Sequence, residues 1–402
     1  MQKKSKTILL VALAYGIWHT CSQWTNTLLA FLYWDTYPPM SILDVSYTQA
    51  FGSFCNALGA FVLGQLIDSS GPKSAFVAAA LLTSIYYIGF SLAKSAFLFF
   101  LVQFCRVGFH FDAATEMYLA TVTTEKERTS AMVSLGLPQG LALLFGPLLA
   151  AKVAMIFSLR TSQLICGICT GAVLVPVVLW LLPDTHAVPK LASARLRPQD
   201  YWPMITRNAA LREAILLRIL IVAPYICYEL IGRQFLLRMY FSGPQDTATM
   251  LLMMGLAIIA VQYLILPRLQ RAFTPKRILQ VALSMLFVSY LMIIYSRSYA
   301  QILFINAMQA ASYSLAYAET STQITSAVGT GELGKATGLA GMGQWIAHCL
   351  MPLYTGHLVA SWHYIYAFYT SVLVTGATLL LVTAWCKNLD ARVQNILPLM
   401  GF

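Results

Sequence analysis

The chain has 402 residues, of which 58% are hydrophobic and 10% are charged, and its formal net charge is +11. An ordinary soluble domain carries about 25% charged residues, so this composition excludes a soluble protein. Apolar stretches of about 20 residues, long enough to cross a bilayer core, recur along the whole chain. The composition therefore predicts a multi-pass integral membrane protein surrounded by lipid.

Twelve apolar stretches are predicted to be spanning helices. The first six lie at 7–34, 47–68, 75–93, 97–122, 129–157 and 161–182, and the second six lie at 213–237, 247–266, 278–296, 301–327, 335–359 and 364–385. The first stretch is too long for the apolar core of a signal peptide, so we expect it to remain in the protein as a helix.

The positive charges are unevenly distributed among the loops. If both termini lie in the cytoplasm, most of the 26 Lys and Arg residues lie on that side, while Lys94, Arg160, Arg238 and Arg297 lie on the other. This asymmetry is the positive-inside rule, which predicts cytoplasmic N- and C-termini in the plasma membrane or an organelle membrane. Because the rule also accounts for the net charge, we expect no nucleic-acid partner.

The longest polar connection divides the chain into two halves. We predict an N-terminal six-helix bundle at 1–182, a cytoplasmic central loop at 183–212, a C-terminal six-helix bundle at 213–386 and a cytoplasmic tail at 387–402. The halves are weakly similar, since a shift of 203 residues aligns Gly64–Lys73 with Pro267–Lys276 and matches Leu, Pro and Lys. Parallel six-span repeats are typical of transporters with a site where the repeats meet.

The segment GQLIDSSGPK at Gly64–Lys73 lies between the second and third predicted spans. Its pattern G-x-L-x-D-x-x-G-x-K resembles the loop signature of the major facilitator superfamily. Gly146-Pro147 resembles the core of that family's antiporter signature, although Ala150 and Ala151 stand where the signature has glycines. The segment 104–136 is similar to the branch of tetracycline-exporter-like and organic-cation-transporter-like proteins.

The resemblance implies an all-α membrane protein of twelve helices in two pseudo-symmetric six-helix bundles. It also implies a monomer that needs no cofactor and moves a small molecule by alternating access. In this family the motif loop acts as a conformational latch, which here would consist of Gly64, Asp68, Gly71 and Lys73. The alternative is a plain turn with a solvated acid.

Ionisable residues within the spans are candidates for proton coupling, because a charge at membrane depth is costly. Asp112 and Glu116 share one helix face, and repulsion between two such carboxylates favours a bound proton. Glu319 aligns with Glu116 at the 203-residue shift. The alternative is that these acids reach interfacial water or pair with Arg128 and Lys335.

Arg106 lies one turn before His110 in the fourth span, where an arginine needs an acid partner or a water-filled cavity. It resembles the family's structural and proton-coupling arginine. Glu229 and Arg233 in the seventh span have the spacing of a structural ion pair.

Two polar stripes are predicted to face a central cavity, with interhelical hydrogen bonding as the alternative. The cavity candidates are Tyr15, His19, Gln23 and Asn26 in the first span, His110 in the fourth, Gln139 in the fifth, Asn306, Gln309, Tyr313 and Tyr317 in the tenth, and His348 in the eleventh. In the family, spans one, four, seven and ten line the cavity.

These residues predict proton-coupled export or exchange of organic cations or amphipathic drugs, since carboxylates and tyrosine rings attract cations. Arg106 supports an alternative, proton-coupled symport of organic anions, and a non-transporting receptor or scaffold on the same fold is a third possibility. We expect no enzyme and no metal site. The dinucleotide-like GTGELG at 329–334 follows a membrane helix rather than a strand, so it predicts no cofactor.

Overall fold

The structure, a computed structural model, describes residues 2–123, 135–183, 198–240, 243–328 and 333–384. All of the regular structure in these residues is helical, which confirms the all-α prediction. The first half contains α1 (Gln2–Trp34), α2 (Ile42–Ser70), α3 (Pro72–Leu92), α4 (Ala96–Val102), the 3-10 helix η1 (Gln103–Gly108), α5 (Phe111–Val122), α7 (Gly136–Ile156) and α8 (Leu159–Cys169), followed by the π-helical segments η2 (Thr170–Leu174) and η3 (Val177–Leu181).

The second half is helical in the same way. It contains α9 (Pro198–Arg207), α10 (Ala209–Tyr240), α11 (Pro244–Ala260), the π-helical segment η4 (Val261–Ile265), α12 (Leu266–Ala272), α13 (Pro275–Ile294), α14 (Tyr299–Ser326), α15 (Leu333–Ser361) and α16 (Ile365–Ala384). Helix α9 lies within the predicted central loop.

Eight stretches of the described chain are long and apolar enough to cross a membrane. Helices α1, α2, α14 and α15 have 28 to 33 residues each and coincide with the four other predicted spans. Within the described residues, each of the twelve predicted spans therefore coincides with one or more helical segments, and the chain is a multi-pass membrane protein.

The chain divides into two compact units. Unit 1 comprises Met1–Ser193 with Phe241–Leu252, and unit 2 comprises Ala194–Tyr240 with Met253–Phe402.

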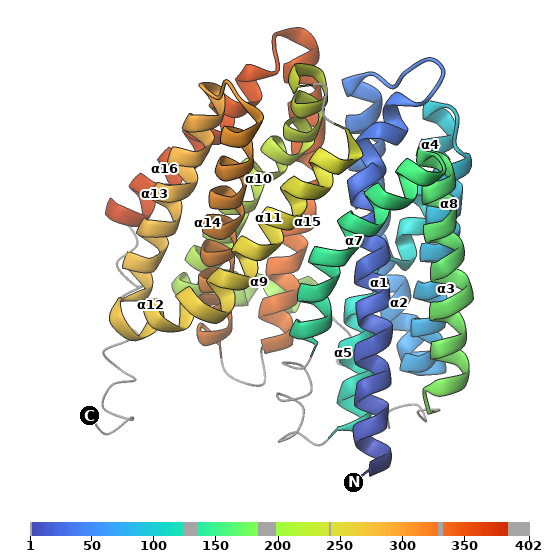
Figure 1. The fold of residues 1–402 in the computed structure, drawn as a ribbon. Helices are drawn as coiled ribbons and strands as arrows, with labels where there is room; N and C mark the ends of the chain where they lie inside the picture. Colours follow the sequence, from blue (N-terminus) through green and yellow to red (C-terminus); the bar gives the residue numbers. More distant parts are fainter. Residues whose placement is uncertain (1, 124–134, 184–197, 241–242, 329–332, 385–402) are drawn as a thin grey trace. The chain divides into compact units, whose positions relative to one another are not determined.

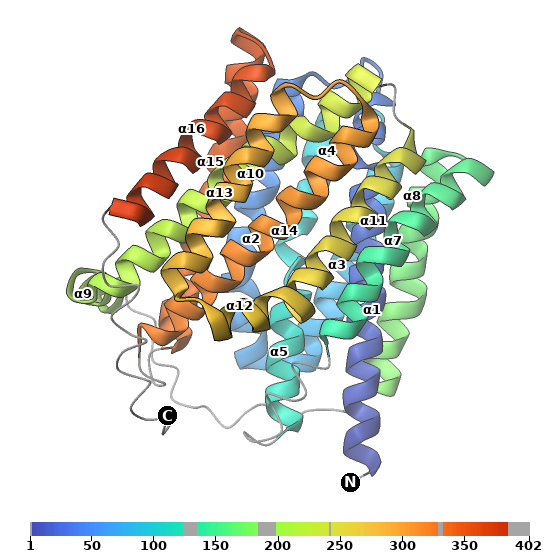
Figure 2. The same ribbon diagram turned by 60° about the vertical axis from the view of Figure 1, so that its left-hand side comes forward.

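In unit 1, helix α1 runs beside α7, as Figures 1 and 2 both show. Gly146 permits this approach, because a Cβ there would lie 2.7 Å from Cβ of Gln23 and 2.8 Å from the Thr20 carbonyl oxygen. Buried polar pairs join α1 to α8. The Trp24 indole donates to Ser162 Oγ at 3.0 Å, a bond whose loss would leave a buried donor unsatisfied.

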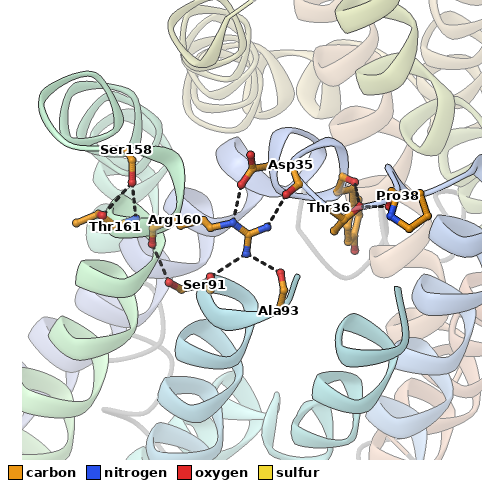
Figure 3. A network of polar contacts seen from close by, with 9 residues as sticks. Asp35, Thr36, Pro38, Ser91, Ala93, Ser158, Arg160 and Thr161 are labelled. Atoms are coloured by element: carbon orange, nitrogen blue, oxygen red, sulfur yellow. Dashed lines mark hydrogen bonds and ion pairs between the residues drawn. The ribbon is translucent and has the colours of Figure 1, made fainter. Parts of the chain in front are cut away.

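An arginine holds together the ends of three helices of unit 1 (Figure 3). Arg160, at the start of α8, donates from Nε to Asp35 Oδ2 at 2.5 Å and from Nη2 to the Asp35 carbonyl at 2.7 Å. Its Nη1 donates to the carbonyls of Ser91 and Ala93 at 3.0 and 2.6 Å. We call this network the Arg160 clamp, and it connects the ends of α1, α3 and α8.

In unit 2, helices α13 and α14 run side by side (Figure 2). Their apolar core includes Leu279, Leu283, Leu315 and Ala316. A proline interrupts the hydrogen bonds of α10 at Pro224, and the Pro224 carbonyl accepts a hydrogen bond from Ser371 Oγ of α16 at 2.9 Å. This hydrogen bond connects α16 to the backbone of α10 inside the bundle.

The fourth span differs from the prediction of one continuous helix over 97–122. It consists of α4, the 3-10 helix η1 and α5, with non-helical dihedral angles at Phe109 (φ −77°, ψ 45°) and His110 (φ −122°, ψ 35°). The prediction was wrong in this respect, because the apolar composition of the stretch does not reveal a change of backbone geometry.

Candidate functional site

The break in the fourth span places several ionisable side chains close together in unit 1. Arg106 precedes the break, His110 lies in it, and Asp112 lies in the first turn of α5 after it. In transporters, interrupted spanning helices commonly form substrate and ion sites, because non-helical backbone at membrane depth must face protein or water.

Close packing by two neighbouring helices accompanies the break. A Cβ on Gly59 of α2 would lie 2.1 Å from the Val107 carbonyl oxygen, and one on Gly108 would lie 2.5 Å from Cβ of Leu82 in α3. No side chain larger than hydrogen fits at Gly59. Helices α2 and α3 therefore enclose η1 from two sides.

His110 has a defined partner at the break. Its Nε2 lies 2.6 Å from the carbonyl oxygen of Asn56 in α2. A carbonyl oxygen can only accept, so Nε2 carries the proton and donates. The ring thus bonds to the backbone of a neighbouring helix.

Arg106 lies against Gly52 and Gln103. A Cβ on Gly52 would fall 2.6 Å from its Nη1, and its Cζ lies 5.9 Å from the centroid of the Phe109 ring. No carboxylate of the described residues forms an ion pair with Arg106, and its buried Nε has no hydrogen-bond partner among them. The charge of Arg106 is therefore not neutralised by a described acid.

Asp112 is the centre of the ionisable cluster. Its Oδ1 lies 2.9 Å from Nε2 of His19, which belongs to α1, and the Tyr15 hydroxyl lies close to the same carboxylate. The His19 side chain is 11% exposed and that of Asp112 is 53% exposed. The imidazole is thus enclosed while the carboxylate is accessible, and the N-terminus of α5 favours the negative charge of the carboxylate.

Aromatic rings fix the orientation of His19. Its ring centroid lies 4.3 Å from that of Tyr15 and 4.8 Å from that of Trp18. Trp18 in turn stacks on Phe111 at 5.4 Å and donates from Nε1 to Thr83 Oγ1 at 3.3 Å. The structure therefore brings Tyr15, His19 and Asp112 together, and Glu116 follows on the exposed side of α5 one turn later.

Other candidates of unit 1 lie apart from this cluster. Gln23 contacts the position of Gly146 in α7, Asn26 lies further along α1, and Gln139 is exposed on α7.

The motif loop forms a turn of one residue. Helix α2 ends at Ser70, Gly71 has φ 86°, and Pro72 opens α3. A left-handed backbone angle of this kind favours glycine. Lys73 donates from Nζ to the Leu182 carbonyl at the end of the sixth span, at 2.8 Å. The side chain of Asp68 and the surroundings of Gly64 lie outside the described residues, and the latch stays a prediction.

The polar residues of the tenth span divide into two groups in unit 2. The first group is hydrogen-bonded within the bundle or buried in it. Asn306 accepts from the Tyr228 hydroxyl at 2.7 Å, Gln309 lies beside Tyr290, and the buried Glu319 lies beside Gln270 and Gln323.

The second group is Tyr313 and Tyr317, which lie beside an arginine that the sequence reasoning did not single out. Arg218 of α10 is 5% exposed, and its Cζ lies 3.6 Å from the centroid of Tyr317. The signal was present in the sequence, since Arg218 is a charged residue inside an apolar stretch. Tyr225, seven residues later on α10, stacks on Tyr313 at 4.0 Å.

The remaining candidates of unit 2 are the pair Glu229 and Arg233 in α10 and His348 in α15. The side chain of Arg233 lies outside the described residues, so the predicted pair with Glu229 is not described. His348 lies 5.6 Å from Trp345, ring centroid to ring centroid. Among the described residues, no group of three or more His, Cys, Asp or Glu side chains could hold a metal ion.

Both a protein family and several solved structures match most of this chain. Residues 8–299 match the profile described as Major Facilitator Superfamily. No curated protein matches the sequence.

Several solved structures share the fold. The nucleoside transporter NupG superimposes on this chain with a TM-score of 0.73 at 13% sequence identity. The match covers 96% of this chain and 98% of the NupG chain. A bacterial homolog of the human lysosomal transporter Spinster, in an inward-facing and unoccupied conformation, has a TM-score of 0.70 at 14% sequence identity. That match covers 95% of this chain and 96% of the homolog. The human organic anion transporter MFSD10 has a TM-score of 0.66 at 15% sequence identity, and the match covers 94% of this chain and 99% of MFSD10. At these identities the likeness concerns the fold alone.

Proposed function

Because the chain belongs to the major facilitator superfamily, we propose that it is a secondary active transporter that works by alternating access and couples an organic solute to protons. Membership makes the protein a multi-pass membrane transporter rather than an enzyme.

The contact between Asp112 and His19 carries the proposal of proton coupling. It joins α1 to α5 at 2.9 Å, directly after the break in the fourth span. When Asp112 is ionised, the pair is a charge-assisted hydrogen bond, which is about twice as strong as a neutral one. Protonation of the carboxylate removes that charge and weakens the connection between the two helices. A bound proton thereby changes the balance between conformations, which is what coupling requires.

Two solute classes follow from the sequence, and the described contacts favour the second. An organic cation exchanged for protons would use Asp112 and Glu116, but Asp112 already contacts His19 and Tyr15. An organic anion moved together with a proton would compensate the positive charge of the arginines within the spans. Arg106 has no carboxylate partner among the described residues.

The remaining parts of the proposal come from the sequence. We place both termini in the cytoplasm, in the plasma membrane or an organelle membrane, and we propose a monomer. The resemblance of residues 104–136 to the tetracycline-exporter-like and organic-cation-transporter-like branch supports a small organic solute.

Vesicles containing the purified protein test the coupling. We expect an inward proton gradient to accumulate p-aminohippurate, an aromatic carboxylate that crosses lipid slowly, and to leave tetraethylammonium unmoved. Asp112→Asn should abolish the accumulation but retain exchange of the solute without a gradient, because only the protonation step is lost. Asp44→Asn is the matched control, since Asp44 also lies in the first turn of a helix of unit 1.

Other outcomes separate the alternatives. Gradient-driven movement of tetraethylammonium alone would replace the anion by the cation and leave the transporter in place. Movement of neither probe, with or without a gradient, would support the receptor or scaffold. Accumulation by Asp112→Asn at the wild-type level would disprove the role of Asp112.

A further inference from the structure

Arg218 is a buried charge at membrane depth. It lies nine residues after the first residue of α10, about 14 Å along the helix at 1.5 Å per residue. The residue is 5% exposed. An arginine in this position is costly and is compensated by protein, water or a ligand.

The partners of Arg218 are all neutral. Its Nε donates to Thr320 Oγ1 at 2.8 Å, and its Nη2 donates to the Tyr317 carbonyl at 3.0 Å and to Ser321 Oγ. These three bonds use three of the five N–H donors of a guanidinium and leave both donors of Nη1 without a bond to a described residue. Glu319 lies on the same helix as these partners, yet it forms no ion pair with Arg218.

A continuous series of aromatic rings extends from this guanidinium. Arg218 Cζ lies 3.6 Å from the Tyr317 ring centroid, Tyr317 lies 5.8 Å from Tyr313, and Tyr313 stacks on Tyr225 at 4.0 Å with 20° between the planes. The Tyr317 hydroxyl donates to Gln344 Oε1 of α15 at 3.3 Å. We call Arg218, Tyr317, Tyr313 and Tyr225 the arginine–tyrosine series.

We propose that the arginine–tyrosine series is a binding site for an aromatic organic anion, which deepens the proposed transport function and rests on it. The carboxylate of the ligand accepts hydrogen bonds from Nη1 of Arg218, the two donors that the protein leaves open. The aromatic ring of the ligand lies against the tyrosine faces, where offset stacking is favourable. The bound anion also supplies the negative charge that Arg218 lacks, whereas a cation would meet repulsion.

A purely structural role for Arg218 makes a different prediction. The three bonds to Thr320, Ser321 and the Tyr317 carbonyl need hydrogen-bond donors only, and no charge. If Arg218 served only to join α10 to α14, the protein would not distinguish ligands by charge at this site. The comparison of matched ligands therefore separates the two roles.

Three ligands of similar size provide that comparison. Thermal unfolding of the purified full-length protein in detergent is measured with benzoate, benzamide and benzylamine, which are anionic, neutral and cationic at pH 7. We expect benzoate to raise the unfolding temperature in a concentration-dependent manner, with an apparent affinity at least about tenfold higher than that of either other ligand. Equal responses to benzoate and benzamide would overturn the proposal.

Variants assign the effect to Arg218. Arg218→Gln should lose the benzoate response, and Arg218→Lys should weaken it about tenfold, because lysine keeps the charge but not the planar fork that pairs with a carboxylate. Arg212→Gln, an exposed arginine of the same helix, is the matched control and should respond like the wild type. A wild-type response of Arg218→Gln, or a loss in Arg212→Gln, would overturn the site.

Two features keep the test decisive. If Arg218→Gln fails to fold, the Arg218→Lys variant and the ligand comparison on the wild-type protein still decide. Binding is measured without a proton gradient, so benzoate binding without gradient-driven transport would disprove the coupling and retain the site. Gradient-driven transport by an Arg218→Gln protein would disprove the site and retain the coupling.

Discussion

At the scale of single residues, two arginines show how partners determine the role of the same side chain. Arg160 donates to a carboxylate and to three backbone carbonyls (Figure 3). Arg218 donates to two hydroxyls and one carbonyl and has no carboxylate partner among the described residues. The first arginine uses four of its five N–H donors and is paired with a carboxylate, whereas the second uses three and retains its charge and both Nη1 donors for a ligand.

Arg160→Lys tests the clamp. Lysine lacks the planar fork that reaches Asp35, Ser91 and Ala93 at once, so we expect the unfolding free energy to fall by about 1–2 kcal/mol. Thermal unfolding in detergent measures the change. Arg297→Lys, an exposed arginine in a short connection of unit 2, is the control and should leave the unfolding temperature unchanged. Equal effects of both variants would show that the clamp adds no stability.

The sequence predicted some of these residues and not others. Asp112, His19 and Tyr15 were found because polar residues interrupt apolar helices, and the structure places them together. Arg218 carries the same signal, but it belongs neither to the polar stripes nor to the acids from which the site was predicted. The neutral partners of Arg218 lie about 100 residues away in the sequence, so its missing charge compensation could not be predicted from local pattern.

At the scale of helices, the fourth span owes its shape to its neighbours. Helices α2 and α3 approach η1 so closely that glycine is required at Gly59. Apolar stretches predict where spans lie, and the predicted bounds agree with the helices to within a few residues for most spans. The change from α-helix to 3-10 helix at Gln103–Gly108 depends on contacts in three dimensions, which a one-dimensional apolar pattern does not contain.

Gly59→Ala tests this packing. The added methyl group would lie 2.1 Å from a backbone oxygen, so either α2 or η1 must shift, at a cost of about 1–3 kcal/mol. We expect lower thermal stability and altered accessibility at the break, measured by thiol labelling of Cys105. Gly338→Ala is the control, because no atom lies within 4 Å of the added Cβ, and it should be neutral or stabilising. An unchanged Gly59→Ala protein would contradict the close approach.

At the scale of the whole molecule, composition and charge predicted the membrane class and the family resemblance predicted the fold. The match of residues 8–299 to the superfamily confirms the second prediction. The membrane orientation stays a prediction, which rests on loop residues such as Lys73 and Arg207 on one side and Arg160 on the other.

Epitope tags test the orientation. We expect tags before Lys3 and between Pro183 and Pro198 to bind antibody only after the membrane is permeabilised, because both positions lie on the positively charged side. A tag between Ser296 and Ser298 should bind without permeabilisation and serves as the opposite control. Binding of the first two tags on intact cells would invert the predicted orientation.

The short connections between helices also bear on how the chain enters the membrane during synthesis. Helix α14 is not among the stretches that are apolar enough to span alone, since it carries Asn306 and Gln309, whereas its predecessor α13 is. The two are separated only by residues 295–298, and α15 is joined to the apolar α16 by residues 362–364. Apolar residues favour and polar residues disfavour insertion of a helix into the bilayer, so we expect each of these pairs to insert together as a helical hairpin. We therefore expect α14 and α15 to reach the bilayer together with their sequence neighbours α13 and α16.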